Sequence, residues 1–275
     1  MKKTYSIILL LLQFCFYGAI AQTENSARNI NLEKAFNRLA LSHDDSEKRL
    51  INDTIIIGVE QYMKSDSVFY SRFENIKFLG QIMSPDSLVK ILTWNIAFSD
   101  GNQNYYCYFL TKPVAKAEIE VYKLTGTSGT AMIRKDTTYT IPDWYGTLYY
   151  DLRPFYLNNE KYYVLLGIDF KDIFLSRKII EIVKVEDGNV LIFGKRCIVN
   201  GTNIYYREVF EYSSLANMTL RFKSDNEIIF DHLSPFSPEY KDNFQYYGPD
   251  FSYDSYVFEK EQWKLKEDVD LRNIE

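Results

Sequence analysis

The sequence predicts a mainly β protein, an antiparallel meander arranged as a sandwich or an irregular propeller-like sheet, with a short helical segment at its N-terminal end. Around a dozen short apolar runs follow one another at the spacing of hairpins. Turn pairs such as Gly-Asn and Asn-Gly separate several of these runs, and 16% of the residues are aromatic. Aromatic side chains pack well on pleated strands, and short strands joined by tight turns favour an antiparallel sheet. No clean repeat of blade length is present, which argues against a regular propeller.

Residues 22–76 form the predicted helical segment. The first helix follows the N-cap candidate Asn31 and carries apolar residues at the spacing of one helix face: Leu32, Ala35, Phe36, Leu39 and Ala40. A second helix begins near Asp44, because Glu47 stands three residues later as in a capping box. A short third helix is predicted after Asp66, with Phe69 and Phe73 one turn apart. These helices have too little apolar surface to stand alone, so we expect them to pack on the β body.

Residues 77–275 form the predicted antiparallel β domain. The expected strands cover residues 77–84, 88–98, 105–111, 117–122, 145–152, 161–170, 178–185, 190–199, 205–212, 220–222, 228–230, 253–259 and 263–267. In the run 88–98, Val89, Ile91 and Thr93 alternate with Leu88, Lys90, Leu92 and Trp94, so both faces carry apolar residues, which predicts burial on both faces. Residues 125–136 are rich in Gly, Ser and Thr and are expected in an exposed loop. Trp94, Trp144 and Phe230 lie within apolar runs and are expected in the core.

Residues 1–21 have the pattern of a signal peptide. Two lysines precede an apolar run at residues 7–17, and Ala19-Ile20-Ala21 supplies the small residues that a signal peptidase recognises, so the mature chain is expected to begin at Gln22. A retained anchor is the less favoured alternative, because a membrane span needs roughly 20 apolar residues. The residues before Cys15 lack the small side chains of a lipobox. We therefore expect a periplasmic or extracellular protein that is not integral to the membrane after cleavage.

The charge of the chain bears on its partners. The net charge is −5, and removal of the signal peptide takes away two lysines and no acid. A surface of this sign repels phosphate backbones, and no basic stripe is present, so no nucleic acid partner is expected.

Two cysteines, Cys107 and Cys197, remain in the mature chain. An oxidising compartment permits a disulfide between them. Both stand in apolar strand-like runs, however, where a free cysteine behaves as a small buried hydrophobe. The free, buried interpretation is favoured, and the disulfide stays open as the alternative.

His232 is the strongest candidate for chemistry in a chain with 2 histidines. It follows Asp231, and an Asp-His pair beside a nearby serine would suit a hydrolase. No nucleophile motif is present, and adjacent side chains on a strand point to opposite faces, so Asp231 is poorly placed to orient the ring. We expect His232 to hydrogen-bond a turn backbone, and we predict no catalytic residue.

The C-terminal part contains the candidate binding residues. A run of aromatic residues over positions 244–256 could form a platform for a glycan or a peptide, although packing in the core is favoured for most of these rings. The nearby acids could suit a hard cation, but the EF-hand pattern is absent, and Asp250 is expected to close a turn. No metal and no cofactor are predicted. The predicted binding residues are Tyr246, Tyr247, Asp250, Tyr253 and His232.

Several motifs resemble a family of exported, uncharacterised β-rich proteins of Gram-negative bacteria. They are Ser84-Pro85-Asp86 before Leu92-Thr93-Trp94, Trp144-Tyr145-Gly146-Thr147-Leu148-Tyr149-Tyr150, Phe230-Asp231-His232-Leu233-Ser234-Pro235, Tyr246-Tyr247-Gly248-Pro249-Asp250 and Glu267-Asp268-Val269-Asp270-Leu271-Arg272-Asn273. The resemblance covers most of the region after Phe78. It implies export and a β fold, and it transfers no catalytic residue.

Two functional hypotheses follow. The first is a non-catalytic envelope or surface protein that binds a protein or glycan partner through its β body. The second is an exported hydrolase that uses His232 with nearby carboxylates. The lack of a nucleophile motif favours the first.

Overall fold

The computed structural model describes residues 31–65, 68–112, 118–127, 132–186 and 190–270. It is mainly β, with 50% strand and 17% helix, antiparallel sheets and two helices within residues 31–63, and this confirms the predicted fold class. The chain divides into two compact units, Met1–Leu79 and Gly80–Glu275, close to the predicted boundary at residues 76/77. In the described part of the chain, no helix combines the length and the apolar character needed to cross a membrane.

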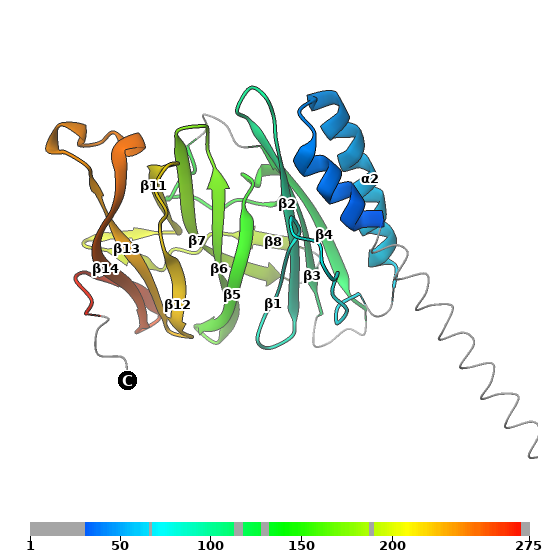
Figure 1. Ribbon diagram of the computed structural model, residues 1–275. Helices are drawn as coiled ribbons and strands as arrows, with labels where there is room; N and C mark the ends of the chain where they lie inside the picture. The colour runs from blue at the N-terminus through cyan, green and yellow to red at the C-terminus, as the bar shows by residue number, and fades with distance from the viewer. Residues whose placement is uncertain (1–30, 66–67, 113–117, 128–131, 187–189, 271–275) are drawn as a thin grey trace, which may run out of the picture. The chain divides into compact units, whose positions relative to one another are not determined.

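The β unit contains three sheets (Figure 1). Sheet A has the order β1-β2-β3-β4 and consists of β1 (Gly80–Met83), β2 (Val89–Ala97), β3 (Gln103–Thr111) and β4 (Glu120–Thr127). Sheet B has the order β11-β7-β6-β5, with β8 also paired to β7, and consists of β5 (Leu148–Leu157), β6 (Glu160–Phe170), β7 (Leu175–Glu186), β8 (Val190–Phe193) and β11 (Arg207–Ser213). Sheet C has the order β10-β9-β15-β14-β13-β12 and consists of β9 (Ile198–Asn200), β10 (Asn203–Tyr205), β12 (Leu220–Ser224), β13 (Glu227–Pro235), β14 (Tyr247–Glu259) and β15 (Gln262–Lys266).

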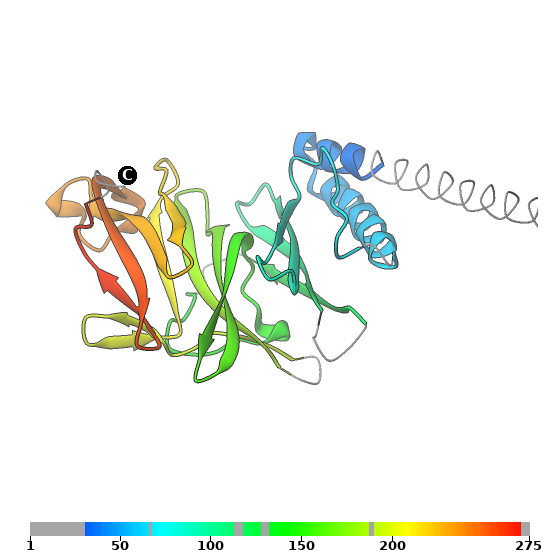
Figure 2. The same ribbon diagram turned by 90° about the horizontal axis from the view of Figure 1, so that it is seen from below.

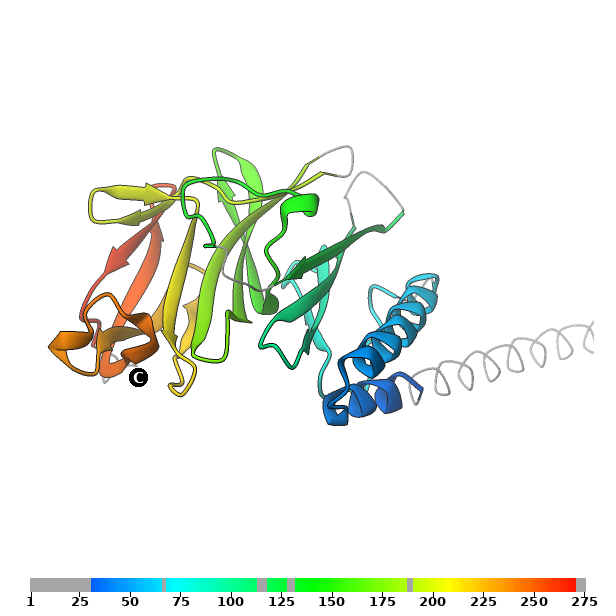
Figure 3. The same ribbon diagram turned by 90° about the horizontal axis from the view of Figure 1, so that it is seen from above.

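Sheet B is the middle layer, and its two faces belong to two different cores (Figures 2 and 3). Along β6, Tyr163 and Leu165 point into the core shared with sheet A. Tyr162 and Val164 alternate with them and point into the core shared with sheet C. Because both faces are covered, the strand shows no alternation of apolar and polar residues.

The predicted core residues are buried. Trp94, Trp144 and Phe230 are at most 3% exposed. Strand β2 is buried on both faces over most of its length, as the apolar residues in both of its alternating sets of positions predict. The two cysteine thiols are free: Cys107 lies in the core between sheets A and B, and Cys197 in the core between sheets B and C. They are separated by sheet B, so the disulfide that the sequence left open is not formed.

Several predicted boundaries are wrong. The run 190–199 is two strands, β8 and β9, because the chain turns at Gly194, whose φ is +101°. A Cβ there would lie 2.6 Å from Arg207 Nη2 and 3.1 Å from the Thr137 carbonyl oxygen, so only glycine fits. Strand β4 continues to Thr127 into the predicted loop, and the predicted turn at residues 187–189 lies outside the described residues. The irregular stretch before β14 contains two short 3₁₀ helices, Pro238–Tyr240 (η2) and Phe244–Tyr246 (η3).

The helical unit contains a first helix over residues 31–41 and α2 (Asp45–Met63). Asp44 caps α2 by accepting the Glu47 backbone N–H at 2.7 Å, which confirms the predicted start. The predicted third helix is absent from the described residues. Phe69 stands in a turn and Phe73 in irregular backbone, and both are buried. Their spacing therefore reflects burial rather than a helix.

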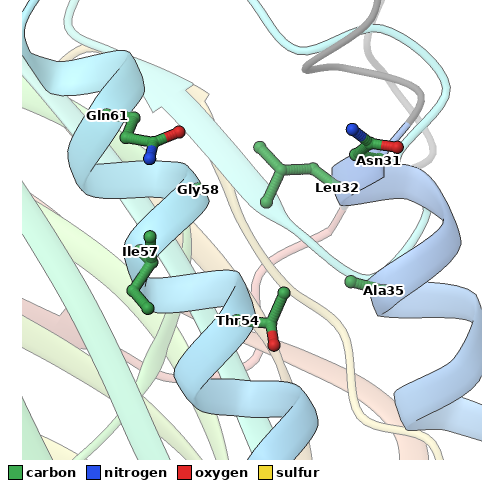
Figure 4. Close-up of a pocket in the computed structure, with 7 residues that line it drawn as sticks. All are labelled: Asn31, Leu32, Ala35, Thr54, Ile57, Gly58 and Gln61. Carbon is green, nitrogen blue, oxygen red and sulfur yellow. The ribbon is translucent and has the colours of Figure 1, made fainter.

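The two helices approach closely where Leu32 of the first helix points toward Gly58 of α2 (Figure 4). A Cβ at Gly58 would lie 2.6 Å from Leu32 Cδ2. A small cavity of about 190 Å³ opens beside this contact, lined also by Ala35 and Thr54. Asn31, predicted as an N-cap, already lies within the helix.

Candidate functional site

A bulge between β13 and β14 brings together two of the predicted site residues. Asp231 pairs with Tyr253 and Leu233 with Pro249, so residues 250–252 stand opposite His232 alone. The extra residues bend the strand, and Phe251 adopts a φ of +71°. This geometry places Asp250 beside the His232 ring.

His232 lies between two carboxylates. Its Nδ1 is 2.8 Å from Asp254 Oδ2, and its Nε2 is 4.0 Å from Asp250 Oδ2. The hydrogen bond with Asp254 is the main cause that raises the pKa of His232, and the charges of Asp254 and Asp250 act in the same direction. Asp254 is buried, and its other oxygen accepts the Asp268 backbone N–H at 3.1 Å. The expected turn-backbone partner of His232 is thus wrong, since the partner is a carboxylate on the neighbouring strand.

The arrangement orients an imidazole but supplies no nucleophile. Asp231 turns to the other face and accepts the Thr219 backbone N–H at 2.6 Å, as the alternation along a strand predicts. Within the described ranges, no serine or threonine hydroxyl hydrogen-bonds His232. The Ser252 hydroxyl donates to Asp250 instead, at 2.7 Å, and Asp250 closes this turn as predicted. Burial alone would raise the pKa of Asp250, but the two hydrogen bonds from Ser252 hold it below its usual value.

The predicted tyrosines do not form a flat platform. Tyr246 stacks on Tyr240, with ring centroids 4.2 Å apart, and Tyr247 packs against Phe244 at 5.0 Å. The Tyr247 hydroxyl also accepts the Asp242 backbone N–H at 3.0 Å. Tyr246 ends η3 and Tyr247 begins β14 directly after it, whereas Tyr253 lies in β14 beyond the bulge. The five predicted residues therefore fall in two groups, one at η3 and one at the bulge.

An exposed apolar surface that the sequence did not predict lies at one end of the β unit. We call it the end surface, and its large side chains are 58–97% exposed: Ile173, Phe174, Leu215 and Phe236. Ser214 joins the β6–β7 turn to the β11–β12 turn, since its N–H donates to the Phe174 carbonyl at 2.8 Å and its hydroxyl to the Ile173 carbonyl. A Cβ at Gly248 would lie 2.6 Å from the Phe236 ring and 3.4 Å from Ala216 Cβ, so the Gly248 backbone packs close to both residues. These contacts link the three loops that carry the exposed side chains.

A cavity of about 560 Å³ lies along β11, the edge strand of sheet B. We call it the edge cavity, and it is lined by Met132, Ile133, Arg134, Lys135, Asp136, Lys171, Tyr205, Val209, Glu211 and Phe244. The lining contains two ion pairs beside its apolar side chains. Lys171 Nζ lies 3.0 Å from Glu211 Oε1, and Arg134 Nε lies 3.0 Å from Asp136 Oδ1. Phe244 belongs to η3, so the predicted aromatic stretch supplies one wall of this cavity.

Two buried ion pairs hold the cavity walls. Arg207 bonds Glu181 at 2.8 Å, with both side chains fully buried, and also donates to backbone carbonyls of Arg134, Thr137 and Phe193. Burial raises the pKa of Glu181, and the Arg207 charge opposes this.

The second pair lies behind Glu211. Arg177 bonds Asp169 at 2.8 Å, and its Nη1 is 4.0 Å from Glu211 Oε1. Burial raises the pKa of Asp169 to about 6, against the opposing charge of Arg177. These charged residues stand in runs that otherwise predict core strands, and nothing in the local pattern reveals their partners.

Among the described residues, no group of three or more His, Cys, Asp or Glu side chains is placed to hold a metal ion. The chain matches no family model, no curated protein and no solved structure at a significant level.

Proposed function

We propose that this chain is an exported, non-catalytic protein that binds a protein partner through its end surface. The observation that carries the proposal is the exposure of four large apolar side chains, contributed by three loops and joined by hydrogen bonds and close packing. Contiguous exposed apolar patches of this kind mark interaction sites in soluble proteins. Loops at one end of a rigid β scaffold are also the usual position of binding residues.

A protein partner suits this surface better than a glycan. Ile173 and Leu215 are aliphatic and offer no flat ring for a sugar to stack on. The tyrosines that could have served as such a platform stack on neighbouring rings instead, as Tyr246 does on Tyr240. Branched aliphatic and aromatic side chains together match the apolar centre of a protein interface.

Phe251 adds a second argument for partner binding. It is 95% exposed and combines this exposure with a left-handed backbone at the β13–β14 bulge. A non-glycine residue in this conformation costs of order 1–3 kcal/mol, and such strain clusters at functional sites. An exposed phenylalanine contributes nothing to the core in return, so a role in recognition accounts for its presence.

A hydrolase remains the second candidate, because Asp254 orients His232 as a carboxylate orients the base of a hydrolytic triad. Its Nε2 faces Asp250 rather than a hydroxyl, which favours the binding function. Export itself is tested by mass spectrometry of the protein recovered outside the cytoplasm. The mature chain should begin at Gln22, and an intact Met1 in that fraction would contradict the proposal.

Site-specific photocrosslinking tests the end surface. A photoreactive amino acid replaces Leu215 in one variant and Tyr156, an exposed ring on β5, in the control. In the cells that produce the protein, the Leu215 probe should give a defined protein adduct that the Tyr156 probe does not give. Phe236→Ser in the Leu215-probe background should remove the adduct, and a cooperative melting curve of this variant checks that it stays folded. The proposal fails if the two probes give the same adducts, or none.

A further inference from the structure

We propose that the edge cavity binds an extended peptide segment, which adds as a short strand to the open edge of β11. This inference rests on the proposed function, since it requires a protein partner, and it assigns a second contact apart from the end surface. The cavity, the edge strand and the charges along it carry the argument. Strand addition uses backbone hydrogen bonds for affinity and pockets for alternate side chains for specificity.

The backbone of β11 presents hydrogen-bonding groups to the cavity side. Strand β11 pairs with β7 on one side only, and it ends the strand order of sheet B. The N–H of Val209 donates to the neighbouring Glu208 side chain at 3.0 Å, so it points away from β7. Ser214, in contrast, donates its N–H to the Phe174 carbonyl, on the β7 side. Since backbone groups alternate along a strand, those of Val209 and Glu211 point outward.

The outward backbone groups limit the ligand to a short segment. Glu208 already occupies the Val209 N–H, which leaves the Val209 carbonyl and the N–H and carbonyl of Glu211 for a new strand. Across the described chain, no protein group accepts this Glu211 N–H. The outward N–H of Val209 is thus occupied, whereas the outward N–H of Glu211 is available. This difference restricts a new strand to one register.

The cavity walls match the side chains of a peptide rather than those of a sugar. Both signs of charge stand on the wall, on Lys171 and Glu211, between apolar side chains of Val209 and Phe244. The Lys135 ammonium lies 4.9 Å from the centroid of the Tyr205 ring and covers one of its faces, and the Phe244 ring packs against Tyr247 at 5.0 Å, which disfavours sugar stacking on either ring. The volume of about 560 Å³ lies within the usual range for a ligand site.

Two substitutions at one position separate the backbone of Glu211 from its side chain. Glu211→Pro removes the outward N–H, and proline is tolerated at such a position because the lost donor pairs with no neighbouring strand. Glu211→Ala removes the same carboxylate but keeps the N–H. The probe is a phage-displayed random heptapeptide library selected on the purified chain, followed by synthetic peptides of the enriched sequences. These peptides should bind Glu211→Pro about tenfold more weakly than Glu211→Ala, as expected when one backbone hydrogen bond is lost and its peptide acceptor is left without a partner.

A second measurement leaves the protein unchanged. N-methylation of alternate peptide residues removes the peptide N–H groups on one edge, so one of the two alternating sets should abolish binding and the other should not. The inference is overturned if no peptide is enriched, if Glu211→Pro and Glu211→Ala bind equally, or if both methylated sets bind. The Leu215 crosslink decides the end surface separately, so failure of the peptide site leaves the proposed function standing.

Discussion

Replacement of Arg207 by methionine tests the buried network beneath the edge cavity. Methionine has a comparable length and no charge, so the change removes the ion pair with Glu181 while filling most of the space. It leaves Glu181 fully buried with the Tyr145 hydroxyl as its remaining side-chain partner, at 2.7 Å. It also removes donors from the carbonyls of Thr137 and Phe193.

We expect Arg207→Met to lower the free energy of unfolding at neutral pH by about 3–5 kcal/mol, the usual cost of breaking a buried pair from one side. The loss should shrink at lower pH. Burial already raises the pKa of Glu181, and removal of the Arg207 charge raises it further. A carboxyl group whose folded pKa lies above its unfolded value contributes stability that is present below the unfolded pKa, about 4.3, and lost as the pH rises through the folded pKa. The variant should therefore lie closer to the wild type at pH 5 than at pH 7.5.

Urea unfolding followed by fluorescence, at pH 5 and pH 7.5, measures both effects. The double variant Arg207→Met/Glu181→Leu should recover part of the loss, because no unpaired charge is left inside, although the orphaned carbonyls remain. Arg134→Met is the matched control, since that arginine pairs with Asp136 at the surface and its removal should change stability little. A loss under 1 kcal/mol for Arg207→Met, or one independent of pH, would show that water reaches the pair and would refute the reasoning.

Three further variants test other features. Trp263→Ala should cost about 3–5 kcal/mol in urea unfolding, because this fully buried ring fills the core between sheets B and C, and a cost below 1 kcal/mol would contradict the described packing. His232→Gln should be less stable than the wild type below pH 6.5 and similar above the raised pKa, since Asp254 stabilises the protonated ring; a melting curve at each pH measures this, and loss of a hydrolase activity in the folded variant would instead support catalysis. Gly58→Ala should lower the melting temperature despite the better helix propensity of alanine, and Leu32→Ala should restore it; a higher melting temperature for Gly58→Ala would contradict the close helix contact.

The sequence correctly predicted those helices and strands that are determined by residues close together in the chain. The capping box at Asp44 and Glu47 marked the start of α2, and the apolar residues in both alternating sets of positions of β2 predicted burial on both faces. The spacing of Phe69 and Phe73 led to the wrong prediction of a third helix, because two buried rings four residues apart also occur in irregular backbone. The break at Gly194 was missed because the groups that crowd it belong to distant segments.

The candidate sites were predicted only in part, for the same reason. Asp250 was expected to close a turn, and it does, by accepting two hydrogen bonds from Ser252. The partner of His232 was missed because Asp254 reaches the ring from the neighbouring strand across a bulge. The edge cavity was missed entirely, since its walls come from segments as distant as Lys135 and Phe244. Pairings of this kind depend on strand order, which single-sequence patterns do not encode.

The two-sided burial of sheet B has a consequence for how the β unit tolerates change. In a strand with one solvent-exposed face, the pattern of polar and apolar residues alone determines which side chains point into the core. Over residues 162–166 of β6 both faces are apolar, so within this stretch the sizes and shapes of residues such as Tyr162, Tyr163 and Leu165 distinguish the correct register from a slip by one residue. A slip there would exchange side chains between the two cores and still leave apolar residues on both faces. Volume-changing substitutions in this strand should thus disturb both cores at once, and the β unit should lose its structure in one transition rather than sheet by sheet.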